Sequence, residues 1–348
     1  KLPELSDEDH TTEEISTPTL IVRQLRWLDY ILDPERLTNQ LMEIHSAVAK
    51  ELVGLFEEQS NLTVPVLDAL SNLQCPVDLI DTMRQRVLER LRSADTEDLP
   101  VMIKFLFQTA TSEDAIPLIS RIRKNLDLAS LRPPEDEAVV LAVPRGTAQP
   151  EALILDAINF GLQFHKFIRD GWLKLIAALA TPESHYALDI MVLCLLYGIA
   201  STRKRVQLLL RRKLMSQQLT AAPIREALER YGRALQQQFP TLLSLTENLM
   251  RLGTQSPTIA TVALDMYQAC FTIFDAYFRQ EVVGALVTHI GSGDSCEIDT
   301  SLAALQAITL RSPAAMRPYA IFIRGILDYI DNLNFDQVRL LFSILGLL

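Results

Sequence analysis

The chain has 348 residues, of which 49% are hydrophobic and 22% are charged, and its formal net charge is −10. This balance is typical of globular domains, and the scarcity of glycine beside abundant leucine favours helices over a β-sandwich. The acidic net charge argues against a surface coated uniformly by nucleic acid, although a local basic patch is compatible with it. No run of 18 apolar residues occurs, so we expect no membrane span.

Apolar residues recur at spacings of three and four along most of the chain, and only 12 residues are glycine. This period predicts amphipathic helices almost everywhere. Ser256-Pro257 and Ser312-Pro313 show the cap-then-proline pattern that is typical of helix starts. Breaks within the longer spans are expected near Gly171 and Pro240. In chain order, the predicted helices span residues 18–32, 34–45, 47–58, 62–73, 77–93, 98–110, 113–125, 150–180, 183–199, 202–215, 221–252, 258–289, 298–310, 313–331 and 335–347.

One long segment interrupts the helical pattern. Residues 132–150 are rich in proline and acids, and Ala138–Val143 is the only stretch with strand character. We therefore predict an N-terminal helical solenoid segment over 1–130, a loop or linker over 131–150, and a second helical domain over 151–348. The predicted fold is all-α, an α-solenoid of stacked antiparallel helix pairs. A compact helical bundle is the alternative, but it would need a very large single core.

Four cysteines, at positions 75, 194, 270 and 296, are too far apart in the sequence to form a CxxC pair. This distribution is typical of buried, reduced thiols in an intracellular protein. The chain begins at Lys1 rather than Met, within an acidic and polar stretch. We therefore expect a piece of a longer chain without a signal peptide.

The sequence contains none of the common catalytic or metal-binding motifs. The P-loop pattern, HExxH, GxSxG and a Cys/His quartet are all absent. Gly291–Gly293 lacks the P-loop lysine and follows a helix, so we interpret it as a turn. His165, near Lys166 and Arg169, and His289, at a predicted helix C-terminus, are interpreted as structural. We therefore expect no enzyme, no cofactor and no metal site.

Two basic clusters stand seven residues apart in this acidic chain. Because seven residues make nearly two helical turns, Lys204 stacks over Arg211 and Arg205 stacks over Arg212. The spacing predicts a basic stripe on one helix face, suited to phosphate groups or to an acidic partner. The alternative is a solvated face that allows Leu208–Leu210 to pack inward. No aromatic residue lies between the cations, so base stacking is not predicted.

Four segments resemble the Fanconi anaemia group D-two family, in the same order along the chain. They are Leu62–Asp68, Glu97–Phe105, Phe274–Gly293 and Phe322–Asn332. Matches in the same order across most of the chain are more specific than a single motif. The resemblance is weakest over residues 1–60 and 130–235, and the chain covers an N-terminal-side part of the family's length.

The resemblance implies a long α-solenoid that forms a heterodimer with the related Fanconi anaemia group I protein. In the family, this pair is a clamp that closes on double-stranded DNA during interstrand-crosslink repair in the nucleus. Monoubiquitination by the Fanconi ubiquitin-ligase machinery locks the clamp, so the family member is a substrate and scaffold. The family's acceptor lysine lies beyond Leu348, and Lys104 and Lys174 do not inherit its role. The connection at Ser46-Ala47 looks shorter than the family's.

From the residues and the resemblance together, we expect a non-enzymatic scaffold that presents surfaces to the group I partner and to DNA. Its expected DNA- or partner-binding residues are Lys204, Arg205, Arg211 and Arg212. A generic helical-repeat adaptor that binds peptides or proteins in its groove, without nucleic acid, is the alternative. An extended basic surface would favour the scaffold, whereas a continuous exposed apolar groove would favour the adaptor. A helical enzyme would need a pocket of convergent polar groups.

Overall fold

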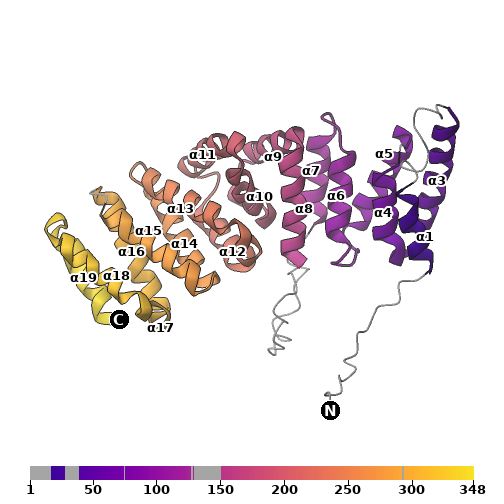
Figure 1. Cartoon of the computed structure of the whole chain (residues 1–348). Coiled ribbons are helices and arrows are strands. Elements are labelled where there is room, and N and C mark those ends of the chain that lie inside the picture. Colours follow the sequence, from indigo (N-terminus) through magenta and orange to yellow (C-terminus); the bar gives the residue numbers. More distant parts are fainter. Residues whose placement is uncertain (1–16, 28–38, 74, 127, 129–149, 292–293) are drawn as a thin grey trace, which may run out of the picture. The chain divides into compact units, whose positions relative to one another are not determined.

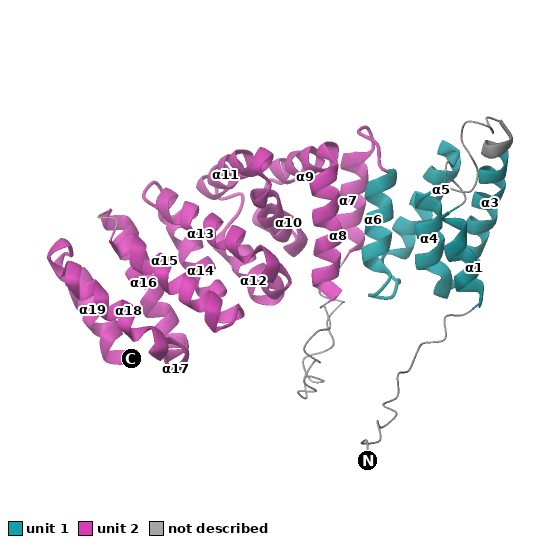
Figure 2. Ribbon diagram, in the orientation of Figure 1, with its two compact units in different colours: residues 1–109 teal, residues 110–348 magenta. Residues whose placement is uncertain are grey.

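The computed structural model describes residues 17–27, 39–73, 75–126, 128, 150–291 and 294–348. Throughout these ranges the regular elements are α-helices and short 3-10 helices (Figure 1). They group into two compact units, Lys1–Thr109 and Ala110–Leu348 (Figure 2). The predicted all-α fold is confirmed, because within each unit the helices stack on their near neighbours in the sequence, as in an α-solenoid.

The first unit is organised around α4, which packs against α1, α3 and α6. Val66, Leu67 and Ala69 of α4 are completely buried, so this short helix supplies the centre of the unit's core. Its described elements are α1 (Thr17–Leu25), α3 (Asn39–Glu58), η1 (Ser60–Leu62), α4 (Thr63–Ser71), α5 (Val77–Arg90) and α6 (Leu99–Thr109). Most of the Leu62–Asp68 segment is therefore helix α4, and most of Glu97–Phe105 is helix α6.

The second unit continues the same stacking over more helices. α10 packs on α11 and α12, α13 on α14, and α14, α15 and α19 all pack on α16. The α-helices of this unit are α7 (Ala115–Asn125), α8 (Pro150–Phe164), α9 (Lys166–Ala178), α10 (Ala187–Gly198), α11 (Ala200–Met215), α12 (Ala221–Tyr231), α13 (Phe239–Gly253), α14 (Pro257–Ile273), α15 (Ala276–Ile290), α16 (Ser295–Arg311), α17 (Pro313–Met316), α18 (Ala320–Arg324) and α19 (Phe335–Leu347). Its 3-10 helices are η4 (Pro182–Ser184), η5 (Gly232–Gln238), η6 (Arg317–Tyr319) and η7 (Gly325–Asn332).

Several long predicted helices are broken in the structure. The predicted helix 150–180 is interrupted at His165, and the expected break at Gly171 is wrong. Gly171 lies inside α9, where an added Cβ would come within 2.8 Å of the Ile119 side chain of α7. The glycine therefore serves close packing between two helices rather than a turn. A break near Pro240 is confirmed, because η5 precedes α13 and this proline stands in the first turn of α13.

Helix starts follow the local signals more closely. α14 begins at Pro257 and α17 at Pro313, each directly after the predicted serine. Two predicted helices, 34–45 and 47–58, are instead one in the described part, since α3 runs through Ser46-Ala47. The predicted linker 131–150 lies outside the described residues apart from Pro150. Ala138–Val143 is outside them as well.

Candidate functional site

The four basic residues predicted to form a stripe lie on α11. Its buried side carries aliphatic residues spaced three and four apart, which are Val206, Leu209, Leu210 and Leu214. Lys204, Arg205 and Arg212 are exposed, and Arg211 is half-buried. The sequence period thus places all four cations away from the apolar side of the helix, and α11 presents them toward solvent.

Leu208 stands between the two rows of cations and is 65% exposed. The alternative interpretation, in which Leu208–Leu210 pack inward, is correct for Leu209 and Leu210 and wrong for Leu208. Met215, seven residues further on, is also exposed, at 52%. Because residues seven apart lie on one helix face, these two side chains form an apolar crest along the basic stripe.

Lys213 belongs to the second basic cluster by sequence, but the fold removes it from the surface. The residue is fully buried, and its Nζ donates a hydrogen bond to the Leu179 carbonyl oxygen over 2.5 Å. Burial, reinforced by the neighbouring Arg212 charge, lowers the pKa of Lys213. Lys213 follows Leu209 by four residues and Leu210 by three, so its side chain lies on the same buried side of α11 as theirs. Lys213 is therefore a structural residue and does not belong to the stripe.

One cation of the stripe, Arg205, forms an ion pair with a neighbouring side chain in the described part of the chain. Arg205 pairs with Asp170 of α9, with 2.5 Å between Nη1 and Oδ1. Within the described residues, Lys204, Arg211 and Arg212 form no ion pair. The unengaged charges of the stripe are thus free to meet an anionic partner.

A groove of about 510 Å³ runs between α9 and α11. Its lining residues are Leu173, Lys174, Ala177, Arg205, Leu208, Leu209 and Arg212. Three of these residues, Lys174, Arg205 and Arg212, are cations, and the others are aliphatic. The contribution of Lys174 is not readable from the sequence, because this residue is distant in sequence from α11 and only the packing of α9 on α11 brings it there.

A buried ion pair supports the helices beneath the stripe. Arg123 of α7 and Asp189 of α10 face each other, with Nε to Oδ1 and Nη2 to Oδ2 distances of 2.5 Å. Arg123 also donates to the Ser184 carbonyl oxygen and lies over the Tyr186 ring. Because the pair is bidentate and almost fully buried, it fixes α10 against α7, and α11 packs on α10.

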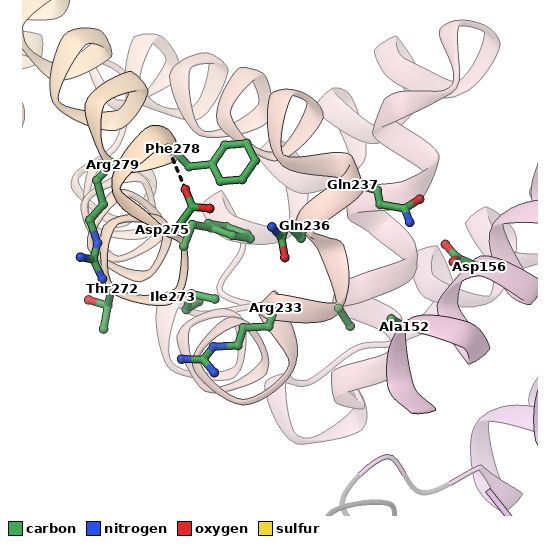
Figure 3. Close-up of a pocket in the computed structure, with 12 residues that line it drawn as sticks. Ala152, Asp156, Arg233, Gln236, Gln237, Thr272, Ile273, Asp275, Phe278 and Arg279 are labelled. Carbon is green, nitrogen blue, oxygen red and sulfur yellow. Dashed lines mark hydrogen bonds between the residues drawn. The ribbon is translucent and has the colours of Figure 1, made fainter. Parts of the chain in front are cut away.

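A second cavity, of about 900 Å³, lies where η5, α8, α14 and α15 come together (Figure 3). Arg233, Gln236 and Arg279 bring hydrogen-bond donors to it, and Asp156 brings a carboxylate whose pKa is raised by partial burial. Asp275 accepts hydrogen bonds from the backbone N–H groups of Tyr277 and Phe278 in the first turn of α15, and the dashed line in Figure 3 marks the bond from Phe278. The described lining can bind polar groups, but it pairs no nucleophile with a base.

His289 and Glu297 form a buried pair across the turn between α15 and α16. The distance from Nδ1 to Oε2 is 2.7 Å, and the His289 ring meets Tyr267 edge to face. The structural interpretation of His289 is confirmed by these contacts. The turn itself, Gly291–Gly293, is described only at Gly291, where the α15 helix ends.

His165 and the cysteines are also accounted for by the fold. His165 stands at the N-terminus of α9, between α8 and α9. All four cysteines are free, and the prediction that they are buried is correct for Cys194 and Cys270 and wrong for Cys75 and Cys296, which are half-buried. Burial raises the pKa of Cys194 and of Cys270 to about 12. In the described part of the chain, no group of three or more His, Cys, Asp or Glu side chains is placed to hold a metal ion. No helix there is long and apolar enough to cross a bilayer.

Comparison with known proteins gives consistent matches. The family model described as "Fanconi anaemia protein FancD2 nuclease" matches residues 43–348. The chain is 32% identical over 386 aligned positions to the Fanconi anemia group D2 protein homolog of Rattus norvegicus, covering 100% of the chain and 26% of that relative. It is 32% identical to the Fanconi anemia group D2 protein of Gallus gallus, covering 27% of it.

Both alignments span more positions than the chain has residues, so the relatives carry residues that this chain lacks. Their absence at Ser46-Ala47 in particular stays a prediction. The chain spans about a quarter of the length of these relatives. The family model covers most of the chain, and the segments that resemble the family include the core helices α4 and α6. The chain therefore belongs to the family of Fanconi anaemia FancD2 proteins.

Proposed function

We propose that this chain is a non-enzymatic scaffold segment of a nuclear DNA-repair subunit in the Fanconi anaemia pathway. In this proposal the subunit pairs with the Fanconi anaemia group I protein, and the pair clamps double-stranded DNA during interstrand-crosslink repair. Family membership supports the pathway, and a stack of helices supports the scaffold, because it offers long faces to partners.

The observation that carries the DNA contact is the basic stripe of α11. Lys204, Arg205, Arg211 and Arg212 occupy the solvent side of one helix in a chain whose net charge is −10. Cations in a row can follow the phosphates of a duplex, and each contact releases bound counterions into solution. The stripe would thus bind without reading sequence, which suits a clamp that must close on any DNA.

The test is the salt dependence of DNA binding by the assembled heterodimer. Replacing Lys204, Arg205, Arg211 and Arg212 by Glu should weaken binding and flatten the slope of log K against log salt, by about 0.9 for each phosphate that the variant no longer neutralises. The matched control reverses four exposed arginines of other helices and turns, which are Arg251, Arg317, Arg324 and Arg339.

An unchanged slope in the α11 variant would rule out the DNA contact. If that variant still binds DNA but no longer binds the group I protein, the result favours a protein–protein adaptor over a DNA-binding scaffold. The exposed crest of Leu208 and Met215 favours this second candidate, because apolar side chains flanked by cations suit an acidic amphipathic helix.

Regulation is proposed to act outside the chain. The ubiquitin acceptor lysine of the family lies beyond Leu348, so Lys104 and Lys174 carry no such role in this proposal. A catalytic role is not proposed, although the matching family description contains the word nuclease. Two buried pairs support this, because Arg123 with Asp189 and His289 with Glu297 are engaged in contacts that hold helices together.

A further inference from the structure

The first unit contains a second basic site, in a concave pocket rather than along a helix face. The pocket has a volume of about 380 Å³ and lies between α1, α4 and α6. Three of its lining residues are cations, namely Arg23, Arg26 and Lys104, and one, Asp68, is a carboxylate. The pocket thus has a formal charge of +2 in a chain that is acidic overall.

Packing of helices that are distant in the sequence creates this concentration of charge. Arg23 lies in α1, and Arg26 directly follows the last residue of α1. Lys104 lies in α6, more than seventy positions further along the chain. Asp68 of α4 pairs with Arg26, with 3.1 Å between Nη1 and Oδ2, and so holds that guanidinium at the pocket wall. The single carboxylate therefore positions one cation, and the lining as a whole keeps an excess of positive charge.

The pocket also has unused hydrogen-bonding capacity. The Arg26 side chain is 40% exposed, and among the described residues its guanidinium donates through Nη1 to Asp68. Its Nη2 is therefore available to an acceptor that a ligand supplies. Asn72 adds a second donor, because its side-chain amide uses only one of its two N–H groups on the Asp68 carbonyl oxygen.

We infer that this pocket binds a phosphorylated serine or threonine side chain of a protein partner. A phosphate monoester carries a charge of about −1.5 to −2 and three acceptor oxygens, which matches the charge of the pocket and its guanidinium, ammonium and amide donors. Arginine-lined sites of this kind are a common mode of phosphopeptide recognition.

The shape of the site favours a phosphopeptide over nucleic acid. A duplex presents its phosphates in rows, which suits cations spread along a surface such as α11. This pocket instead has its cations in the lining of a single cavity, together with the apolar side chains of Val64, Pro65 and Phe105. A single phosphate on a short side chain suits such a cavity, because the aliphatic carbons of that side chain can contact the apolar part of the lining.

The test uses the 348-residue chain and fluorescence anisotropy. The probes are a pool of degenerate peptides with a fixed central phosphoserine, the same pool without phosphate, and a random-sequence DNA duplex. The pocket variant combines Arg23→Gln with Lys104→Gln. Its matched control, in the same unit, combines Lys50→Gln with Arg92→Gln, both exposed residues outside the pocket.

The parent should bind the phosphorylated pool more tightly than the unphosphorylated one. The pocket variant should lose about tenfold or more of that affinity, since each charge-assisted hydrogen bond contributes strongly. The control should bind as the parent does. Affinity should also rise with pH through about 6, where the phosphate gains its second charge. Lys104→Arg, which keeps the charge, should retain binding.

Three results would overturn the inference. The first is equal binding of the two peptide pools by the parent. The second is a loss in the control as large as in the pocket variant. The third is binding of the DNA duplex, reduced by the pocket variant, without preference for the phosphorylated pool. Circular dichroism of each variant verifies its helical fold. The outcome does not depend on whether α11 contacts DNA, because the pocket uses other residues.

Discussion

At the scale of single residues, the second unit depends on polar and charged side chains that are buried among apolar ones. Asp189 is completely buried, and its carboxylate accepts hydrogen bonds from Arg123 and from the backbone N–H of Tyr186. Lys213 and His185 lie nearby, each with a backbone carbonyl as partner. Such groups are tolerated in a core only where their hydrogen bonds are made, so they specify how the helices meet.

Replacing Asp189 by Asn should strongly destabilise the protein. The amide keeps the shape of the side chain but leaves the buried Arg123 charge uncompensated, so we expect a loss of about 3–5 kcal/mol in unfolding free energy. Urea unfolding followed by circular dichroism measures it. The control, Asp170→Asn, breaks the exposed pair with Arg205 and should cost at most about 1 kcal/mol. Equal losses in both variants would contradict the assigned role.

His185 should make stability depend on pH. Its Nδ1 lies 2.9 Å from the Thr181 carbonyl oxygen, and its buried Nε2 has no partner among the described residues. Burial, followed by the positive charge of Lys213, lowers the pKa of His185 below 6.5, while the Thr181 hydrogen bond and Asp189 act in the opposite direction. The unfolded chain therefore binds the proton first, and stability falls as pH falls below 6.5 toward the folded pKa.

The measurement compares unfolding free energies of the parent and His185→Gln above and below pH 6.5. The parent should lose more stability on acidification than the variant, because only the parent has this group to protonate. Parallel losses in the two proteins would show that His185 does not control the pH dependence.

At the scale of elements, the close approach of α9 to α7 depends on Gly171. An added Cβ would lie 2.8 Å from the Cδ1 atom of Ile119, which is fully buried. Helix propensity acts in the other direction, since alanine in a helix interior is about 1 kcal/mol more favourable than glycine. The effect of the steric conflict on stability can be measured separately from the effect of helix propensity, because Ile119→Val removes the Cδ1 atom and no other group.

Gly171→Ala should destabilise the parent by about 1–3 kcal/mol as an overpacked core, measured by urea unfolding. In the Ile119→Val background the same change should cost much less or be stabilising, because the atom that it would contact is gone. A double-mutant cycle gives the coupling between the two sites. A coupling of zero would mean that Gly171 does not set the distance between α7 and α9.

At the scale of the whole molecule, the stacked helices act as a support for surfaces. The stripe of α11 and the pocket between α1, α4 and α6 belong to different units, and each is complete within its own unit. A fold in which each helix packs mainly on near neighbours can carry several such sites without a shared catalytic centre. This organisation is the physical basis of the proposed scaffold role.

The partner proposal is tested by size-exclusion chromatography with light scattering. We expect the chain, mixed with a Fanconi anaemia group I protein from the same source, to elute as a one-to-one complex. The chain alone and the group I protein alone are the controls. If the mixture elutes as two separate proteins, the contacts of the proposed pair lie outside these 348 residues.

The sequence by itself determined the helical fold, because the apolar period and the caps act over distances of a few residues. It also determined that Lys204, Arg205, Arg211 and Arg212 share the solvent side of one helix, since that follows from a spacing of seven. The resemblance of short segments to a known family was likewise readable from the sequence and is confirmed by comparison over the whole chain.

Only the tertiary structure decided which of these residues act together. It buried Lys213 against Leu179, exposed Leu208, and brought Lys174 beside α11. It also assembled the pocket around Arg23, Arg26 and Lys104 from helices far apart in the sequence. The physical reason is that local helix geometry determines which residues share one face of a helix. Which other helix packs against that face depends on side-chain packing between segments that are distant in the sequence, and a local pattern does not encode that packing.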